Sequence, residues 1–127
     1  MITVKRAYET ATSGDGKRFL VERLWPRGIR KTSLRLDGWL KDVAPSTELR
    51  QWFSHGPAKW TEFGHRYSRE LDANPRAWQS IVDVAAGGTT VTLIYSSHDG
   101  EHNNAVALRE YLEKKMQWHS APRRKAA

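Results

Sequence analysis

The stretch from Thr89 to Tyr95 constrains this chain more than any other part of its sequence. Its residues are β-branched or apolar, and no polar residue alternates with them. A strand of that composition is typical of the centre of a parallel sheet, where helices cover both faces. Parallel strands need long crossover connections, so the sequence predicts strands that are separated by helices.

Shorter signals predict the elements around this strand. Further strands are expected at Ile2–Val4 and at Arg18–Leu24, and Pro26 stops the second of them. Apolar residues at helical spacing predict five helices, whose inward residues are Leu36, Trp39, Leu40 and Val43; Leu49, Trp52 and Phe53; Trp60, Phe63, Tyr67 and Leu71; Trp78, Ile81, Val82 and Ala85; and Ala105, Leu108, Leu112 and Met116. The expected fold class is α/β: a small, open, mainly parallel sheet with helices on both faces, in a single domain.

Size and composition narrow the class of protein. The chain has 127 residues, of which 1–119 are expected to form one domain and 120–127 a disordered basic tail. It contains no Cys, which excludes disulfides, thiolate nucleophiles and Cys-based metal sites. Six Trp residues are present, and most are expected to anchor the core. Since neither an apolar signal core nor a membrane span is recognisable, the cytoplasm is the expected compartment.

The formal net charge of +7 raises the question of a nucleic-acid partner. A nucleic-acid-binding accessory protein, which would use Arg30, Lys31, Arg35 and the tail, is the alternative function. These residues lack the regular spacing of a nucleic-acid-binding helix. A solvated basic surface is therefore the simpler interpretation.

Two polar segments follow predicted strands, and these are the candidate site. They are Glu22–Gly28 and Tyr95–Asn104. Adjacent parallel strands end at the same edge of a sheet, where open α/β sheets bind their ligands. The sequence thus predicts a pocket for a small anionic ligand, bearing phosphate or carboxylate, at the carboxyl ends of the strands.

Each predicted pocket residue has a chemical reason. Arg23 and Arg27 match the oxygens of an anion, and Trp25 offers a stacking face. Ser96 and Asn103 add donors at the start of the last helix. If the pocket catalyses a reaction, His102 is the best general acid or base, because imidazole titrates nearest neutral pH. No cofactor is indicated, and the ligand, the reaction and the oligomeric state stay open.

Structural interpretations stand beside these functional ones. Glu22 could pair with an arginine while Trp25 fills the core, and Asn103 or Asp99 could simply cap a helix. The loop matches neither a phosphate-binding glycine motif nor a nucleophile elbow. A metal site is not expected. His98 and His102 would lie on one face of a helix, but Gly100 places them in a loop. The further ligands that such a site would need are Asp99, Glu101 and His55.

The same segments resemble the domain-of-unknown-function family 488, in its short YeaO-like branch. The resemblance rests on Val4–Tyr8, Val21–Gly28, Leu36–Lys41, Ala44–His55, Trp60–Tyr67 and Leu93–Ala105. Two positions depart from the pattern, with Glu22 in place of Asp and Ser54 in place of Gly.

The resemblance implies an α/β sandwich and leaves the function open. It also implies that Trp52, Phe53 and His55 help to wall the cavity, unless they belong to the core or to a helix end. The resemblance implies that other branches of the family carry Cys in the loop after the last strand, where this chain has Tyr95, Ser96 and Ser97. Thiol chemistry therefore does not carry over to this chain.

Overall fold

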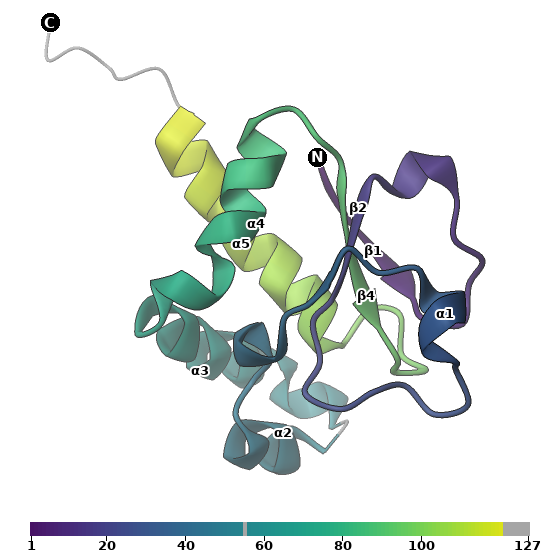
Figure 1. Ribbon diagram of the computed structural model, residues 1–127. Coiled ribbons are helices and arrows are strands. Elements are labelled where there is room, and N and C mark those ends of the chain that lie inside the picture. The colour runs from purple at the N-terminus through teal and green to yellow at the C-terminus, as the bar shows by residue number, and fades with distance from the viewer. Residues whose placement is uncertain (55, 121–127) are drawn as a thin grey trace, which may run out of the picture.

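The structure is a computed structural model that describes residues 1–54 and 56–120. Four strands alternate with helices along the chain (Figure 1). The elements are β1 (Ile2–Arg6), β2 (Lys17–Leu20), α1 (Lys31–Leu34), β3 (Gly38–Trp39), α2 (Thr47–Phe53), α3 (Trp60–Asp72), α4 (Pro75–Ala86), β4 (Val91–Tyr95) and α5 (Asn104–Ser120). No described helix is both long enough and apolar enough to cross a lipid bilayer. His55 and the predicted tail from residue 121 onward lie outside the described residues.

All strand pairs in the sheet are parallel, in the order β1-β4-β2-β3. β4 is the central strand, and each of its five residues is buried. β2 pairs with β4 from Lys17↔Val91 to Leu20↔Ile94. The predicted α/β fold with a parallel sheet is confirmed. The boundaries differ from those predicted, because β1 extends to Arg6 and β2 ends at Leu20.

The two faces of the sheet are covered unequally. α4 and α5 pack on one face, where Val91, Leu93 and Tyr95 of β4 join the larger core cluster. Ile94 of β4 faces the other way, into a smaller cluster that contains Leu34 of α1. Figure 1 shows α5 and α1 on opposite sides of the strands, and α2 and α3 beyond the strand ends.

The predicted helix over Leu36–Val43 is wrong. The segment instead forms β3 and a 3-10 turn at Lys41–Val43. The backbone N–H of Leu40 donates to Leu20, which places this stretch along the open edge of β2. Four apolar residues at helical spacing fit a short strand followed by a turn equally well, and pairing with the sheet edge decides between the two.

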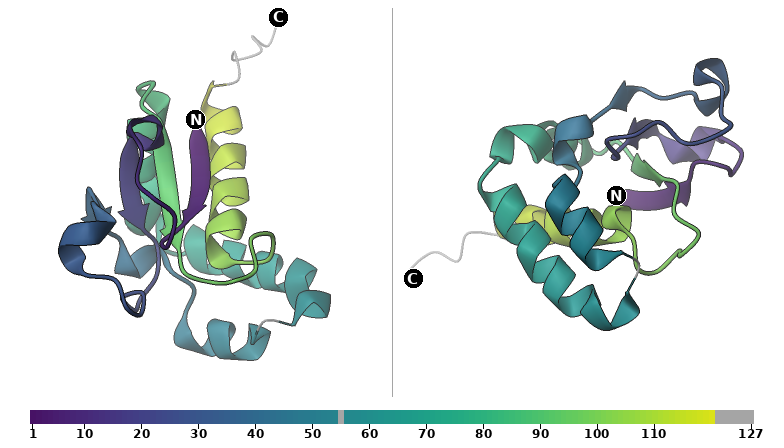
Figure 2. Two further views of the ribbon diagram at one scale, coloured as in Figure 1. Left: turned by 90° about the vertical axis from the view of Figure 1, so that its right-hand side faces the viewer. Right: turned by 90° about the horizontal axis from the view of Figure 1, so that it is seen from below.

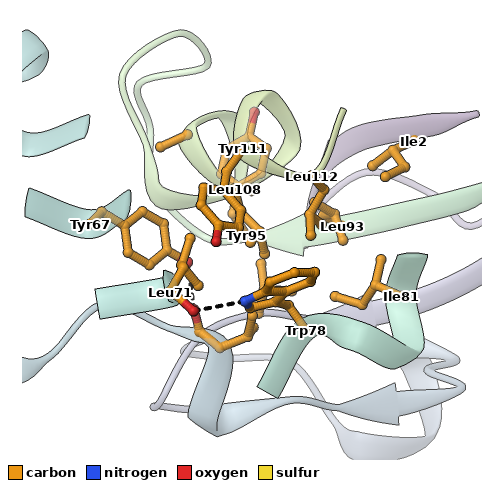
Figure 3. Packing of buried hydrophobic residues seen from close by; sticks show 14 of the residues in the cluster. Ile2, Tyr67, Leu71, Trp78, Ile81, Leu93, Tyr95, Leu108, Tyr111 and Leu112 are labelled. Atoms are coloured by element: carbon orange, nitrogen blue, oxygen red, sulfur yellow. Dashed lines mark hydrogen bonds between the residues drawn. The ribbon is translucent and has the colours of Figure 1, made fainter. Parts of the chain in front are cut away.

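The larger core cluster is built around an aromatic anchor on α4. Trp78 is 5% exposed, and its Nε1–H donates to the carbonyl of Leu71 at 2.9 Å (Figure 3). Leu108 and Leu112 of α5 are fully buried in the same cluster. The expectation that most Trp residues are core anchors needs correction, since Trp25, Trp39, Trp52 and Trp60 are only half-buried.

A buried ionic network ties the start of β2 to its neighbours. The Asp15 carboxylate accepts hydrogen bonds from Lys5 of β1 and from Arg18 of β2. The Arg18 guanidinium, on a residue only 4% exposed, also donates to the carbonyls of Leu34 and Arg35. Burial alone would raise the pKa of the Asp15 carboxyl, but its hydrogen bonds outweigh that effect and hold the pKa well below its ordinary value.

Candidate functional site

A cavity of about 210 Å³ lies where β2 and β4 end. The view from below in Figure 2 looks onto this edge of the sheet, with α2 and α3 beside the start of α5. The lining residues come from both strand exits and from three helices or the segments before them; they are Glu22, Arg23, Ala44, Pro45, Arg50, Phe53, Phe63, Ser96, Ser97, His102, Asn103 and Asn104. Parallel pairing thus brings together segments that are more than 70 residues apart in the chain.

Glu22 fixes the two strand exits to each other. One of its carboxylate oxygens accepts the backbone N–H of Ser96 and the other accepts the Ser96 hydroxyl, both at 2.7 Å. The Asn104 amide adds a second tie by donating to the Val21 carbonyl at 2.7 Å. The alternative interpretation, an ion pair of Glu22 with an arginine, is not seen among the described residues. The floor of the cavity is therefore held by hydrogen bonds that are already in place.

The loop after β4 is a helix cap with a histidine beside it. Asn103 accepts the backbone N–H of Val106 at 3.0 Å, which confirms the predicted capping of α5. Hydrogen bonds from the backbone N–H groups of Glu101 and His102 lower the pKa of the Asp99 carboxyl. That carboxylate lies 3.0 Å from His102 Nδ1, so Nδ1 carries the proton and Nε2 is left for other partners.

Two arginines from separate elements line the cavity in different ways. Arg23 Nε donates to the Pro45 carbonyl at 3.1 Å, and its Nη2 reaches the Ala44 carbonyl at 3.5 Å. Arg50, on α2, is exposed, and its guanidinium makes no hydrogen bond or ion pair with any part of the chain that the structure describes. Arg23 is therefore held in position, whereas the Arg50 guanidinium is available to a ligand.

An apolar wall faces these cations. Phe53 and Phe63 are both buried, with ring centroids 4.5 Å apart. Trp60 stacks on Phe63 and meets the His102 ring edge-on at 5.2 Å. The predicted contribution of Phe53 to the cavity wall agrees with this geometry. Trp52 instead lies outside the lining, where its ring contacts the cations of Lys59 and Arg66.

The structure places the predicted ligand residues in two groups. Arg23, Ser96, His102 and Asn103 line the cavity together. Trp25 does not, because the chain folds back after it and its Nε1–H donates to the Ile29 carbonyl at 2.6 Å.

Arg27 lies outside the lining too. Its side chain is exposed and its carbonyl accepts the hydroxyl of Tyr8. Any role for Trp25 or Arg27 in this cavity would require a change in the turn that holds them.

Arg50 is the functional candidate that the sequence analysis missed. It stands three residues before Phe53, so a helix there puts both on one face. That spacing was the available signal, but nothing in the sequence places α2 beyond the strand ends. Within residues 1–54 and 56–120, no group of three His, Asp or Glu side chains is arranged to hold a metal ion.

Comparisons with known proteins agree on one family. The model of the inactive DUF488-N3 subclade matches residues 1–127. The uncharacterized protein YeaO of Escherichia coli is 40% identical over 111 residues, which cover 87% of this chain and 96% of the relative. The uncharacterized protein Rv3073c of Mycobacterium tuberculosis is 39% identical over 111 residues, or 87% of this chain and 92% of the relative. No solved structure matches.

Proposed function

Since this chain belongs to the DUF488 family and matches its inactive N3 subclade along its whole length, we propose that it binds a small organic anion in the cavity at the strand ends. One observation carries the proposal. The guanidinium groups of Arg23 and Arg50 come from separate elements and line one cavity with an apolar wall. Each offers forked N–H donors that match phosphate or carboxylate oxygens.

The electrostatics of the cavity favour an anion. Glu22 is the carboxylate that lines it, and both of its oxygens already accept hydrogen bonds from Ser96. Arg23 and Arg50 therefore outweigh it in charge. Two guanidinium groups near one small, partly enclosed volume repel each other, and an anion between them removes that repulsion.

The shape of the cavity limits the body of the ligand. Its volume of about 210 Å³ is below the range of about 300–1,000 Å³ that is typical of sites for drug-sized molecules. Phe53 and Phe63 give it an aromatic wall. A compact ligand with a flat or apolar body and one anionic group fits both features.

The proposal assigns His102 to binding rather than catalysis. The description of the matching subclade as inactive supports this choice. With Nδ1 directed at Asp99, Nε2 accepts a hydrogen bond when the ring is neutral and donates one when it is protonated. Either role lets the His102 ring contribute a hydrogen bond to a bound anion or to its polar body.

Phenyl phosphate and benzoate are suitable probes, because each joins an aromatic ring to one anionic group. Thermal unfolding should shift upward with either probe, since a ligand of the folded state stabilises it by about 2.7 kcal/mol at a hundred times its Kd. Isothermal titration should give an affinity that falls by about tenfold in Arg50→Ala, which removes charge-assisted hydrogen bonds.

Arg76→Ala provides the matched control. Arg76 is an exposed arginine on α4 that does not line the cavity, and its replacement should leave the affinity unchanged. The proposal fails if neither probe binds at millimolar concentration, or if Arg50→Ala and Arg76→Ala weaken binding equally.

A further inference from the structure

A second hollow lies at the same edge of the molecule, between the segment after β1 and α1. Its volume is about 650 Å³, and it is more open than the first cavity. It is lined by Ala7, Tyr8, Glu9, Thr10, Ala11, Gly28, Ile29, Arg30, Ser33 and Arg35. The proposed binding of a small anion does not use this hollow.

A chain of direct contacts joins the cavity to this hollow. Ser97 lines the cavity, and its carbonyl accepts the Nε–H of Arg6 at 2.9 Å. The Arg6 guanidinium lies 3.0 Å from the ring nitrogen of His98 and 4.5 Å from the centre of the Tyr8 ring. Tyr8 lines the hollow and donates its hydroxyl to the Arg27 carbonyl. These contacts connect the linings of the two concave sites, which we treat together as one candidate binding surface.

This surface is rich in arginines without acidic partners. Arg27, Arg30 and Arg35 are exposed, and none of their guanidinium groups forms an ion pair or a hydrogen bond with residues 1–54 or 56–120. Glu9 is the acid that lines the hollow, and its carboxylate accepts the backbone N–H of Arg6. A group of unpaired cations of this kind suits a ligand that carries several negative charges in sequence.

Tyr8 adds an exposed aromatic ring, which the binding of a simple polyanion would not require. It is 47% exposed, although a large aromatic side chain is usually more buried. The Arg6 guanidinium packs over its ring, and the phenol hydroxyl is anchored at Arg27, so the ring is held in a fixed orientation at the surface. A rigid exposed ring beside a cation is an arrangement on which proteins stack the bases of single-stranded nucleic acid.

We propose that the ligand is the phosphorylated end of a single-stranded nucleic acid, with the terminal phosphate in the cavity and the following nucleotides on Arg6, Tyr8 and the hollow. This inference rests on the proposed function of the cavity and names its ligand. A terminal phosphate is a monoester with about two negative charges near neutral pH, whereas each internal diester carries one. The paired guanidinium groups of Arg23 and Arg50 match the more highly charged group.

Fluorescence anisotropy with labelled oligonucleotides of about eight nucleotides tests the proposal. Oligothymidylate and oligouridylate would each be prepared in two pairs. In the first pair the 5′ end carries either a phosphate or a hydroxyl, and in the second pair the 3′ end does. The fluorescent label is placed at the end that is not varied. One terminal phosphate should tighten binding by about tenfold or more, because it adds charge-assisted hydrogen bonds. A preference for either end, in DNA or in RNA, supports the proposal.

Variants separate the two parts of the surface. Arg50→Ala should abolish the difference in affinity between the phosphorylated end and the hydroxyl end. Arg35→Ala should weaken both forms equally and lower the slope of log affinity against log salt by about 0.7, the amount expected for one phosphate contact on a single strand. Tyr8→Ala should weaken both forms about fivefold or more, while Tyr8→Phe retains the stacking ring. Arg76→Ala is the control and should change neither form.

Three results would overturn the proposal. The first is equal binding of phosphorylated and hydroxyl ends by the wild-type protein, because the cavity would then play no part. The second is equally tight binding of heparin and of a duplex, which would identify the arginines as a general polyanion surface. The third is tight binding of phenyl phosphate with no oligonucleotide bound more tightly, in which case the proposed function of the cavity stands and this extension of it fails. If neither phenyl phosphate nor any oligonucleotide binds, both fail.

Discussion

Replacing Asp15 by Asn should destabilise the fold far more than the same change at an exposed ion pair. The side chains keep the same shape, but the buried Arg18 guanidinium loses its charged partner and the Lys5 ammonium loses its ion pair and one of its two hydrogen bonds to this side chain. Removing one partner of a buried pair costs about 3–5 kcal/mol, because the remaining charge stays out of water. Since Lys5 reaches solvent and Arg18 keeps two carbonyl partners, we expect the lower end, about 3 kcal/mol.

Urea unfolding followed by circular dichroism measures this difference as a shift of the midpoint at constant slope. Glu62→Gln is the control, because it removes a carboxylate from an exposed pair with Arg66 on α3, where such pairs contribute about 0–1 kcal/mol. Near-equal losses in the two variants would refute the reasoning.

The pH dependence of the free energy of unfolding gives a second check. The pKa of Asp15 is lowered by folding, so its stabilisation is complete above the unfolded pKa of about 3.9 and is lost as pH falls below that value. The gap between wild type and Asp15→Asn should therefore close in acid.

Three further predictions concern other parts of the chain. Gly16→Ala should cost about 3 kcal/mol or more in urea unfolding, because Gly16 has φ +63° and a Cβ there would lie 2.0 Å from the Thr90 carbonyl oxygen; Gly28→Ala, also at positive φ but in open space, should cost only about 1 kcal/mol, and the reverse order would contradict the steric argument. Asn103→Ala should lower stability by about 1 kcal/mol through loss of the cap of α5, whereas Asn103→Asp keeps the capping oxygen and should retain most of it. Deleting residues 120–127 should leave Tm nearly unchanged, and a large drop in calorimetry would show that this segment docks on the domain.

The parts of the fold that could be predicted from the sequence are those where pattern and environment coincide. The apolar run predicted from Thr89 to Tyr95 calls for burial on both faces, and its part Val91–Tyr95 forms the central strand with all five residues buried. The segment Leu36–Val43 was misassigned because its apolar spacing has two solutions. The choice depends on the free edge of β2, which is a tertiary partner and has no trace in the local sequence.

The same distinction applies to the candidate site. Arg23, His102 and Asn103 could be assigned to one edge of the sheet, because parallel strands end on the same side. Trp25 follows the same strand but is carried away by a turn that bonds its indole to Ile29. Arg50 reaches the cavity only because α2 packs beyond the strand ends, and that placement depends on contacts of the whole core.

The strand order has a consequence for how this protein is made. β1 and β2 both pair with β4, and they do not pair with each other. During translation, β1 must therefore wait for a partner that lies about 90 residues later, which is on the order of ten seconds at ordinary elongation rates. The central strand is the last one to leave the ribosome, so the apolar segments of β1 and β2 stay exposed until then. We expect newly made chains to depend on chaperones, and the rate at which β4 emerges to limit how soon the sheet can form.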